Sequence, residues 1–487
     1  MLESSSIEKE PTLLAVPSQP EPPRYWWLRR LTLLGVLLVL GVAGLRWWWG
    51  HEAQRRIDAI IADAHRRGEP ILPGDFVTPG RRGPAKALLP RGRIFAWSPA
   101  ELKFADAFDA FNLAAPPNAA DRAMIRGMMK AHAGLLARVR AARGLIGVAG
   151  DAPLAVSDFA AVYSLSGCQD LSLLLDLSAV ESHAAGNDAE ALEYIRDMGT
   201  AADAATDGNL SGISYLVAGH ITYFEAEEAI QMADALWIAR DGSATPTGAA
   251  NRAQVQGLIA ELADGRDRRA AGVRMWEIER STALRGERDD ADSQLHPAAL
   301  AYLGLPIFHL ARVRQARELG PEIGAARQAQ YPAAIKMLPT HTRYKPPLSI
   351  LQNVAAGGAF YASGDPRGMF RRIYAALLTR RVAATALAIR LYAADHDGHP
   401  PETLPQLVPQ YLPGAPIDPF AADGRSLRYL PHRNPPVIYS VGENGTDEGG
   451  AAGWTPGHFF RMLVWHGADV VFPLRPATTA PTSAPAG

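Results

Sequence analysis

The sequence predicts a mainly α-helical chain with one transmembrane helix, a helical body and a small C-terminal α+β module. Three observations support this fold class. An apolar segment lies between two aromatic clusters near the N-terminus, residues 158–335 are rich in alanine and leucine, and short β-type runs separated by turns follow residue 400. With 487 residues, the chain is long enough to form more than one domain with its own core.

The composition excludes several classes of protein. Lysine and arginine number 49 against 50 aspartates and glutamates, so no excess of positive charge favours nucleic acid as a partner. The single cysteine, Cys168, excludes an internal disulfide framework and a cysteine-rich zinc site. No activating base lies near it in the sequence, so we expect a buried, unreactive thiol.

The N-terminal region predicts a membrane anchor. Residues 1–23 are rich in serine, glutamate and proline and are expected to form a disordered tail. Residues 24–49 are expected to form a transmembrane helix, because aromatic clusters at 25–27 and 47–49 enclose an apolar centre and stand about 20 residues apart. Arg46 and the tryptophans occupy the place where a signal peptide has small residues, so we expect the segment to be retained. Basic residues flank both ends and do not fix the orientation.

Residues 50–100 are expected to contain a juxtamembrane helix and a connector. In residues 51–67, isoleucines recur on one side of a helix among basic residues. The sequence then becomes dense in glycine and proline, which favours irregular structure.

Residues 101–365 are predicted to form a helical body. A helical hairpin is expected where residues 171–185 and 189–205 are helix-forming and a Gly-Asn-Asp turn at 186–188 separates them. The turn resembles that of a tetratricopeptide repeat, but no period of about 34 residues runs through the region. A repeat-like body and a non-repeating bundle therefore both remain open.

The last structured unit is expected at residues 366–474. A helix is predicted first, because apolar residues recur at helical spacing up to a stop at Asp397. Two short β-type runs, at 427–430 and 437–441, then indicate a small hairpin. The low-complexity residues 475–487 are expected to form a disordered tail.

A series of short motifs follows the helix of this unit. In chain order they are Asp395-x-Asp397-Gly398-x-Pro400, Leu404 with Leu407, Tyr411-Leu412-Pro413, Asp418-Pro419-Phe420, Tyr429, Tyr439-Ser440-Val441-Gly442, Asn444-Gly445 and Gly449-Gly450. This order resembles the globular half of the major pseudopilin of type II secretion. The whole chain is similar to uncharacterised single-span envelope proteins of planctomycete-like bacteria. The resemblance implies a bacterial inner-membrane protein that contacts lipid through one span, with its body in the periplasm and envelope or secretion proteins as partners.

The anchor departs from that of a pseudopilin. A pseudopilin carries a processing motif, a glycine and phenylalanine with a glutamate shortly after, at the head of its apolar helix, and none precedes residue 31. Arginines such as Arg371 and Arg380 also interrupt the helix that begins the C-terminal unit. The module therefore looks like one reused on a different anchor.

The resemblance also implies a calcium site in the acidic loop at residues 443–450. The positions that it implies are Asn444, Asp447 and Asp469, with Glu443 as an addition. Calcium takes six to eight oxygen ligands, and a glycine-bent acidic loop offers carboxylate, amide and carbonyl oxygens. The alternative is a tight turn with solvated carboxylates.

Two further groups of polar residues are interpreted as structural. The cluster Asp395, His396, Asp397 and His399 has the composition of a zinc site, but it falls where the helix turns into the module. A second group lies in a predicted helix and is expected to form a solvated face, and its members are His220, Glu225, Glu227 and Glu228. Charged residues around Glu277 are expected to form surface ion pairs.

Three functions remain open. The sequence lacks a P-loop, a dinucleotide fingerprint and a nucleophile elbow, which favours a non-enzymatic envelope scaffold or binding protein. The second function is a component associated with type II secretion or pilus-like machinery. The third is a membrane-anchored hydrolase that uses carboxylates in the helical body.

Overall fold

The computed structural model describes residues 25–76, 117–143, 159–206, 212–239, 247–264, 266–285, 313–314, 316–339, 366–451 and 468–474. In these residues the chain is mainly helical and carries one small sheet, as predicted. Both predicted tails and residues 77–100 of the predicted connector lie outside the described residues.

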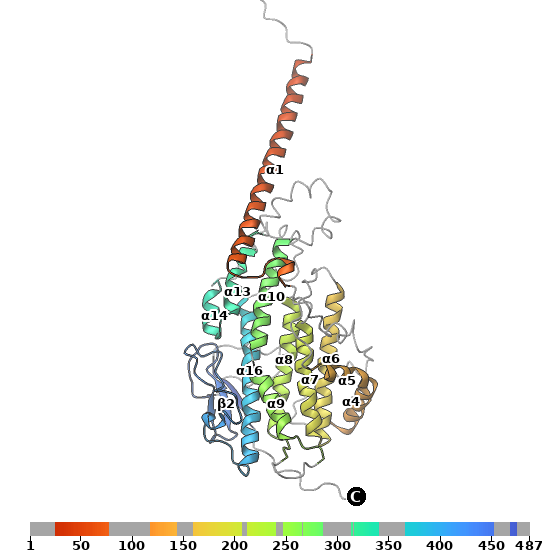
Figure 1. The fold of residues 1–487 in the computed structure, drawn as a ribbon, viewed down its shortest axis with the longest axis vertical. Coiled ribbons are helices and arrows are strands. Elements are labelled where there is room, and N and C mark those ends of the chain that lie inside the picture. Colours follow the sequence, from red (N-terminus) through yellow and green to blue (C-terminus); the bar gives the residue numbers. More distant parts are fainter. Residues whose placement is uncertain are drawn as a thin grey trace, which may run out of the picture.

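Helix α1 (Trp26–Arg66) is the one described helix that is long and apolar enough to cross a membrane. Its 41 residues correspond to a length of about 60 Å. Apolar side chains such as Leu34 and Leu38 are about two-thirds exposed (65% and 66%), which no core helix would tolerate. The predicted membrane and juxtamembrane helices are therefore one continuous helix, and Figure 1 shows it rising from one end of the body near α10 and α13.

The body is built from helices that mostly pack against helices close to them in the sequence. Their bounds are α4 Ala119–Ala131, α5 Ala133–Ala142, α6 Phe159–Ala184, α7 Asp188–Thr206, α8 Gly212–Ala233, α9 Arg252–Ala263, α10 Arg266–Arg285, α13 Gly320–Ala326 and α14 Tyr331–Met337. Helix α7 packs between α6 and α8, while α4 lies on α6 and α5 on α7. The hairpin of α6 and α7 confirms the predicted helix pair, and its turn uses Gly186 with a φ of 76°, a conformation that favours glycine. The tetratricopeptide-like interpretation stays a prediction.

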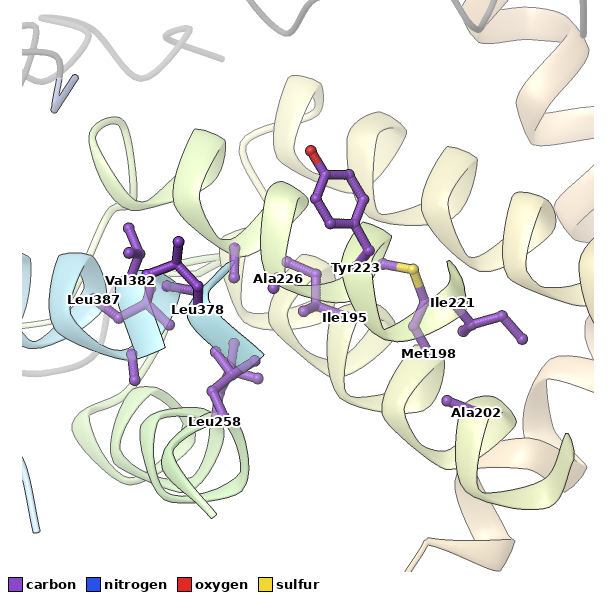
Figure 2. Close-up of a cluster of buried hydrophobic side chains, with 14 of the residues drawn as sticks. Ile195, Met198, Ala202, Ile221, Tyr223, Ala226, Leu258, Leu378, Val382 and Leu387 are labelled. Atoms are coloured by element: carbon purple, nitrogen blue, oxygen red, sulfur yellow. The ribbon is translucent and has the colours of Figure 1, made fainter. Parts of the chain in front are cut away.

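Helix α16 (Pro366–Asp395) runs between this body and the C-terminal sheet (Figure 1). It packs along α8 and α9 and presents Leu378, Val382 and Leu387 to a core that α7, α8 and α9 complete. Figure 2 shows these side chains facing Leu258 and the α7–α8 pair. Most of α16 is buried although arginines interrupt its sequence. The predicted body and the predicted C-terminal unit therefore share this helix.

The C-terminal unit adds a three-stranded antiparallel sheet. The 3₁₀ turn Leu404–Leu407 precedes strands β1 (Arg428–Leu430), β2 (Val437–Ser440) and β3 (Val470–Pro473), in the order β1-β2-β3. Both predicted β-type runs are strands, with Tyr439 of β2 paired to Arg428 on one side and Val471 on the other. The predicted helix stop is confirmed at Asp397, whose φ is 54°.

Candidate functional site

In the acidic loop after β2, Asp447 is held by hydrogen bonds to both of its carboxylate oxygens. Oδ1 of Asp447 accepts hydrogen bonds from the Tyr439 hydroxyl at 2.9 Å and the Gly449 N–H at 3.1 Å. Its Oδ2 lies 3.1 Å from Nε of Arg428. Partial burial raises the pKa of Asp447, but these three donors outweigh it and hold the pKa below its ordinary value. Both carboxylate oxygens of Asp447 are thus already bonded.

Asn444 and Asp469 meet at a third residue, Glu448. Asn444 donates to Oε1 of Glu448 at 2.6 Å, and the backbone N–H of Asp469 donates to Oε2 at 3.2 Å. Oδ2 of Asp469 accepts from the Gly450 N–H at 2.8 Å, while its Oδ1 is buried with no hydrogen-bond partner among the described residues. Burial and the nearby charge of Glu448 raise the pKa of Asp469 to about 6.

Glu443 faces away from that group. Its carboxylate accepts a hydrogen bond from the Tyr331 hydroxyl at 2.5 Å and pairs with Nε of Arg371 at 3.0 Å. Tyr331 belongs to α14 and Arg371 to α16, so Glu443 joins the module to the body.

The predicted calcium ligands are only partly brought together by the loop. The described residues contain no group of three or more histidine, cysteine, aspartate or glutamate side chains arranged to hold a metal ion. The carboxylates of Glu448 and Asp469 fit the oxygen chemistry of calcium, whereas Asn444 presents its Nδ2 to Glu448 and its Oδ1 accepts from the Thr446 N–H at 2.8 Å, so its oxygen would have to be turned towards a cation. Asp447 and Glu443 bond to other residues, and Glu448, on which Asn444 and the backbone of Asp469 converge, was not in the predicted ligand set.

The cluster at the end of α16 is a structural joint. Asp395 accepts from Nη1 of Arg252 at 2.5 Å and from the Tyr411 hydroxyl at 2.8 Å. The ring of His396 stacks on that of Tyr392 with centroids 3.7 Å apart. These contacts tie α9 and the module to the end of α16, which agrees with the structural interpretation of these residues.

The carboxylates of α8 do not form the expected solvated face. Glu225 is 2% exposed and pairs with Arg380 of α16 at 2.7 Å. Glu228 is also buried, so the expectation was wrong for both residues. The periodicity of the sequence did not reveal this burial, because α8 is apolar enough to be covered by α6, α7 and α16 together.

Asp176 of α6 and Glu228 of α8 form what we call the carboxyl pair. Asp176 is 4% exposed and Glu228 is 7% exposed. Oδ1 of Asp176 and Oε2 of Glu228 are buried and have no hydrogen-bond donor in the described part of the chain. Burial raises the pKa of Asp176 to about 7, aided by the charge of Glu227 and opposed by its hydrogen bond with Glu228. Burial and the charge of Asp176 also raise the pKa of Glu228. A hydrogen bond between two carboxyl groups needs one proton, so the pair shares one.

Sequence reasoning missed Asp176. The available signal was a single aspartate inside the apolar run at residues 171–180, where a charged side chain is costly without a partner. Cys168, on the same helix, is buried as predicted, and burial raises the pKa of its thiol to about 12.

A second buried carboxylate, Glu69, lies just after α1. Its Oε2 pairs with Arg280 at 2.8 Å and Arg67 at 3.2 Å, and its Oε1 pairs with Arg327 at 2.8 Å. Arg327 also contacts Glu277 at 3.0 Å, and because Glu277 is buried, the expectation of a surface ion pair was wrong for this residue. We call these five residues the Glu69 cluster. Burial raises the pKa of Glu69, but the three arginines outweigh it and lower the pKa to about 2.

Comparison of the chain with known protein families, with characterised proteins and with solved structures gives no match.

Proposed function

We propose that the chain is a non-enzymatic, membrane-anchored scaffold or binding protein of the bacterial envelope. The observation that supports this best is the joint between anchor and body. Helix α1 continues beyond its apolar segment without a break. Just after the end of α1, the Glu69 cluster connects the chain to α10 and to the α13–α14 region. A small apolar cluster of Ala64, Ile71, Leu284 and Ala316 packs beside it. Such a joint holds the body at a fixed place relative to the membrane.

The proposed location is the inner membrane, with the body in the periplasm. The test uses two bacterial strains, each of which expresses the full chain fused at its C-terminus to a reporter. One reporter is active only in the cytoplasm and the other only in the periplasm. Activity of the periplasmic reporter, with the protein retained in the membrane fraction, is the expected result. Activity of the cytoplasmic reporter would overturn the proposed orientation and leave the anchor itself intact.

The proposed module is pseudopilin-like and clamped by calcium through Asn444, Glu448 and Asp469. The two carboxylates repel each other, and a divalent cation between them would relieve that repulsion. The test is thermal unfolding of the full chain with calcium and with chelator. We expect calcium to raise the midpoint in the wild type, not in Asp469→Asn, and still in Asp423→Asn, which changes an exposed carboxylate of the same module. Absence of a calcium effect in the wild type would remove the clamp and leave the scaffold proposal standing.

A second candidate function is that of a membrane-anchored hydrolase, and the carboxyl pair is the observation that favours it. Two carboxyl groups that share a proton near neutral pH have the properties of a general acid and base. The test is reaction of the full chain with a water-soluble carbodiimide and an amine, followed by mass spectrometry. Modification of Asp176 or Glu228 in the folded protein would favour a hydrolase. Protection of both, with modification of the exposed Asp423, would favour the scaffold.

A further inference from the structure

Helices α10 and α16 bring two arginines to the same level of the body. Trp276 of α10 stacks on Phe370 of α16 with ring centroids 5.9 Å apart and planes within 4°. Arg269 lies seven residues before Trp276, and the same rise from Phe370 along α16 reaches the interval between Tyr374 and Arg381. The two helices run in opposite directions at this contact, so Arg269 and Arg381 lie near each other.

Arg381 has no carboxylate partner within salt-bridge distance among the described residues. Its Nη1 donates to the carbonyl oxygen of Ile417 at 2.5 Å. The carboxylate whose charge acts on Arg381 is that of Asp418, which accepts from the Phe420 and Val441 N–H groups and from the Ser440 hydroxyl, at 2.8 to 2.9 Å. Burial lowers the pKa of Arg381 to about 10, and the charge of Arg269 contributes. Among the described residues, the buried carboxylate of Asp418 is thus the one acidic group that acts on Arg381, against the like charge of Arg269.

Arg269 is half-buried, and its Nε is buried with no acceptor in the described part of the chain. The adjacent Tyr374 donates its hydroxyl to the carbonyl oxygen of Gln328 at 2.8 Å, and a neutral phenol supplies no counter-charge for a guanidinium. Guanidinium groups that are removed from water normally find an anion.

We propose that Arg269 and Arg381 form a binding site for a small oxyanion of the phosphate or carboxylate class at the α10–α16 interface. Two guanidinium forks can donate several parallel hydrogen bonds to one such group, and partial burial strengthens them. The proposal is independent of the scaffold function and of the calcium clamp.

The position of the site favours a soluble anion over a lipid headgroup. Leu284, which packs with Ala64 of α1, marks the membrane-proximal end of α10. Arg269 lies 15 residues before Leu284, about 22 Å farther along the helix. The part of α1 that follows Trp49 adds about 25 Å between the aromatic cluster and the body. A headgroup at the membrane surface is therefore out of reach.

The test uses the full chain in a neutral detergent and measures thermal unfolding as inorganic phosphate replaces chloride at constant ionic strength. We expect a saturable rise of about 2–4 °C in the wild type. Arg269→Gln and Arg381→Gln should abolish the rise. The matched control is Arg314→Gln, because Arg314 is a 77%-exposed arginine paired with Glu318, and it should keep the full rise.

If Arg381→Gln does not fold, Arg269→Gln alone is sufficient for the test. We expect Arg269→Gln to fold, because Arg269 makes no hydrogen bond among the described residues that the substitution would remove. Without phosphate, this variant should be at least as stable as the wild type, since a repulsion is removed. The absence of a saturable rise in the wild type, or a rise that persists in Arg269→Gln, would overturn the proposal. A wild-type rise caused by anionic lipid vesicles and not by phosphate would assign the site to a headgroup and overturn the soluble ligand.

Discussion

At two buried carboxylate sites of this molecule the pKa is shifted in opposite directions. Glu69 and Asp176 are both more than nine-tenths buried between helices. Three arginines reach Glu69 and lower its pKa to about 2, whereas Glu228 and Glu227 are the described charged groups that act on the buried Asp176, and its pKa rises to about 7. Burial is common to both sites, so the number of arginines within reach decides which form of the carboxyl group is stable.

The two sites also differ in what they join. The Glu69 cluster connects residues far apart in the sequence, since Glu69 and Arg280 are separated by 211 positions. It fixes the end of α1 to the body. The carboxyl pair lies inside the body between α6 and α8 and adds no net attraction when both groups are charged. We therefore expect substitutions at the two sites to change stability with opposite signs.

The largest effect is expected for Glu69→Gln. The amide cannot neutralise Arg280, whose side chain is 5% exposed, and an uncompensated buried charge is strongly destabilising. Denaturant unfolding of the full chain should show a loss of about 3 kcal/mol. The control is Glu52→Gln, which removes a 26%-exposed carboxylate of α1 that pairs within the helix with the half-exposed Arg56 and should cause a much smaller change. Equal losses in both variants would contradict the importance of burial.

Asp176→Asn is expected to stabilise the protein at pH 8. The amide donates a hydrogen bond to Glu228 without a proton from solvent, which removes the cost of a second buried charge. The gain is bounded by the rise of the pKa from 3.8 to about 7, or about 4 kcal/mol.

Glu181 provides the matched control for Asp176 on the same helix. It is 4% exposed, but its carboxylate pairs with Arg122 at 2.8 Å and Arg126 at 2.7 Å. Glu181→Gln should therefore lower the free energy of unfolding. Destabilisation of similar size in Asp176→Asn would show that the carboxyl pair is not strained by charge.

The pH dependence of the two sites should be opposite. The native state holds its proton on Asp176 to a higher pH than the unfolded chain, so the wild type loses stability as the pH rises from about 4 to 7. The difference in free energy of unfolding between Asp176→Asn and the wild type should therefore grow over this range and then level off. Glu69 has a lowered pKa, so its contribution should be complete above about pH 5 and disappear as the pH falls towards 2. Unfolding of both variants and the wild type across this range measures both. Parallel curves for Asp176→Asn and the wild type would contradict the shared proton.

The smallest effect is expected for Glu443→Gln. Glu443 and Arg371 are 24% and 21% exposed, so the ion pair is partly screened, and its loss should cost about 1 kcal/mol. The control is Asp423→Asn, an exposed carboxylate of the same module, which should leave thermal unfolding unchanged. No difference between the two variants would mean that Glu443 does not help to join the module to the body.

The sequence predicted the local features of the fold well. The apolar α1, the α6–α7 hairpin, the helix stop at Asp397 and the strands around Tyr429 and Tyr439 all follow from short patterns. The long-range partners could not be predicted in this way. Asp176 and Glu228 belong to different helices, and nothing near Glu69 in the sequence indicates Arg280 or Arg327.

The candidate loop was predictable only in part. Its glycines and carboxylates mark residues 443–450, but their partners depend on how α14 and α16 approach the sheet. Tyr331 and Arg371 direct Glu443 towards the body, whereas Asn444 and Asp469 converge on Glu448. The pseudopilin resemblance and the calcium clamp stay predictions.

The most direct test of a rigid joint at the Glu69 cluster measures distances between α1 and the body by pulsed electron paramagnetic resonance. Spin labels at Gln54→Cys on α1 and Ala260→Cys on α9 report this distance, and Cys168 is 1% exposed and therefore protected from labelling. We expect a narrow distance distribution in the otherwise unchanged chain and in Asp176→Asn, and a broad one in Glu69→Gln. A broad distribution in the unchanged chain, or a narrow one in Glu69→Gln, would contradict a rigid joint made by the Glu69 cluster.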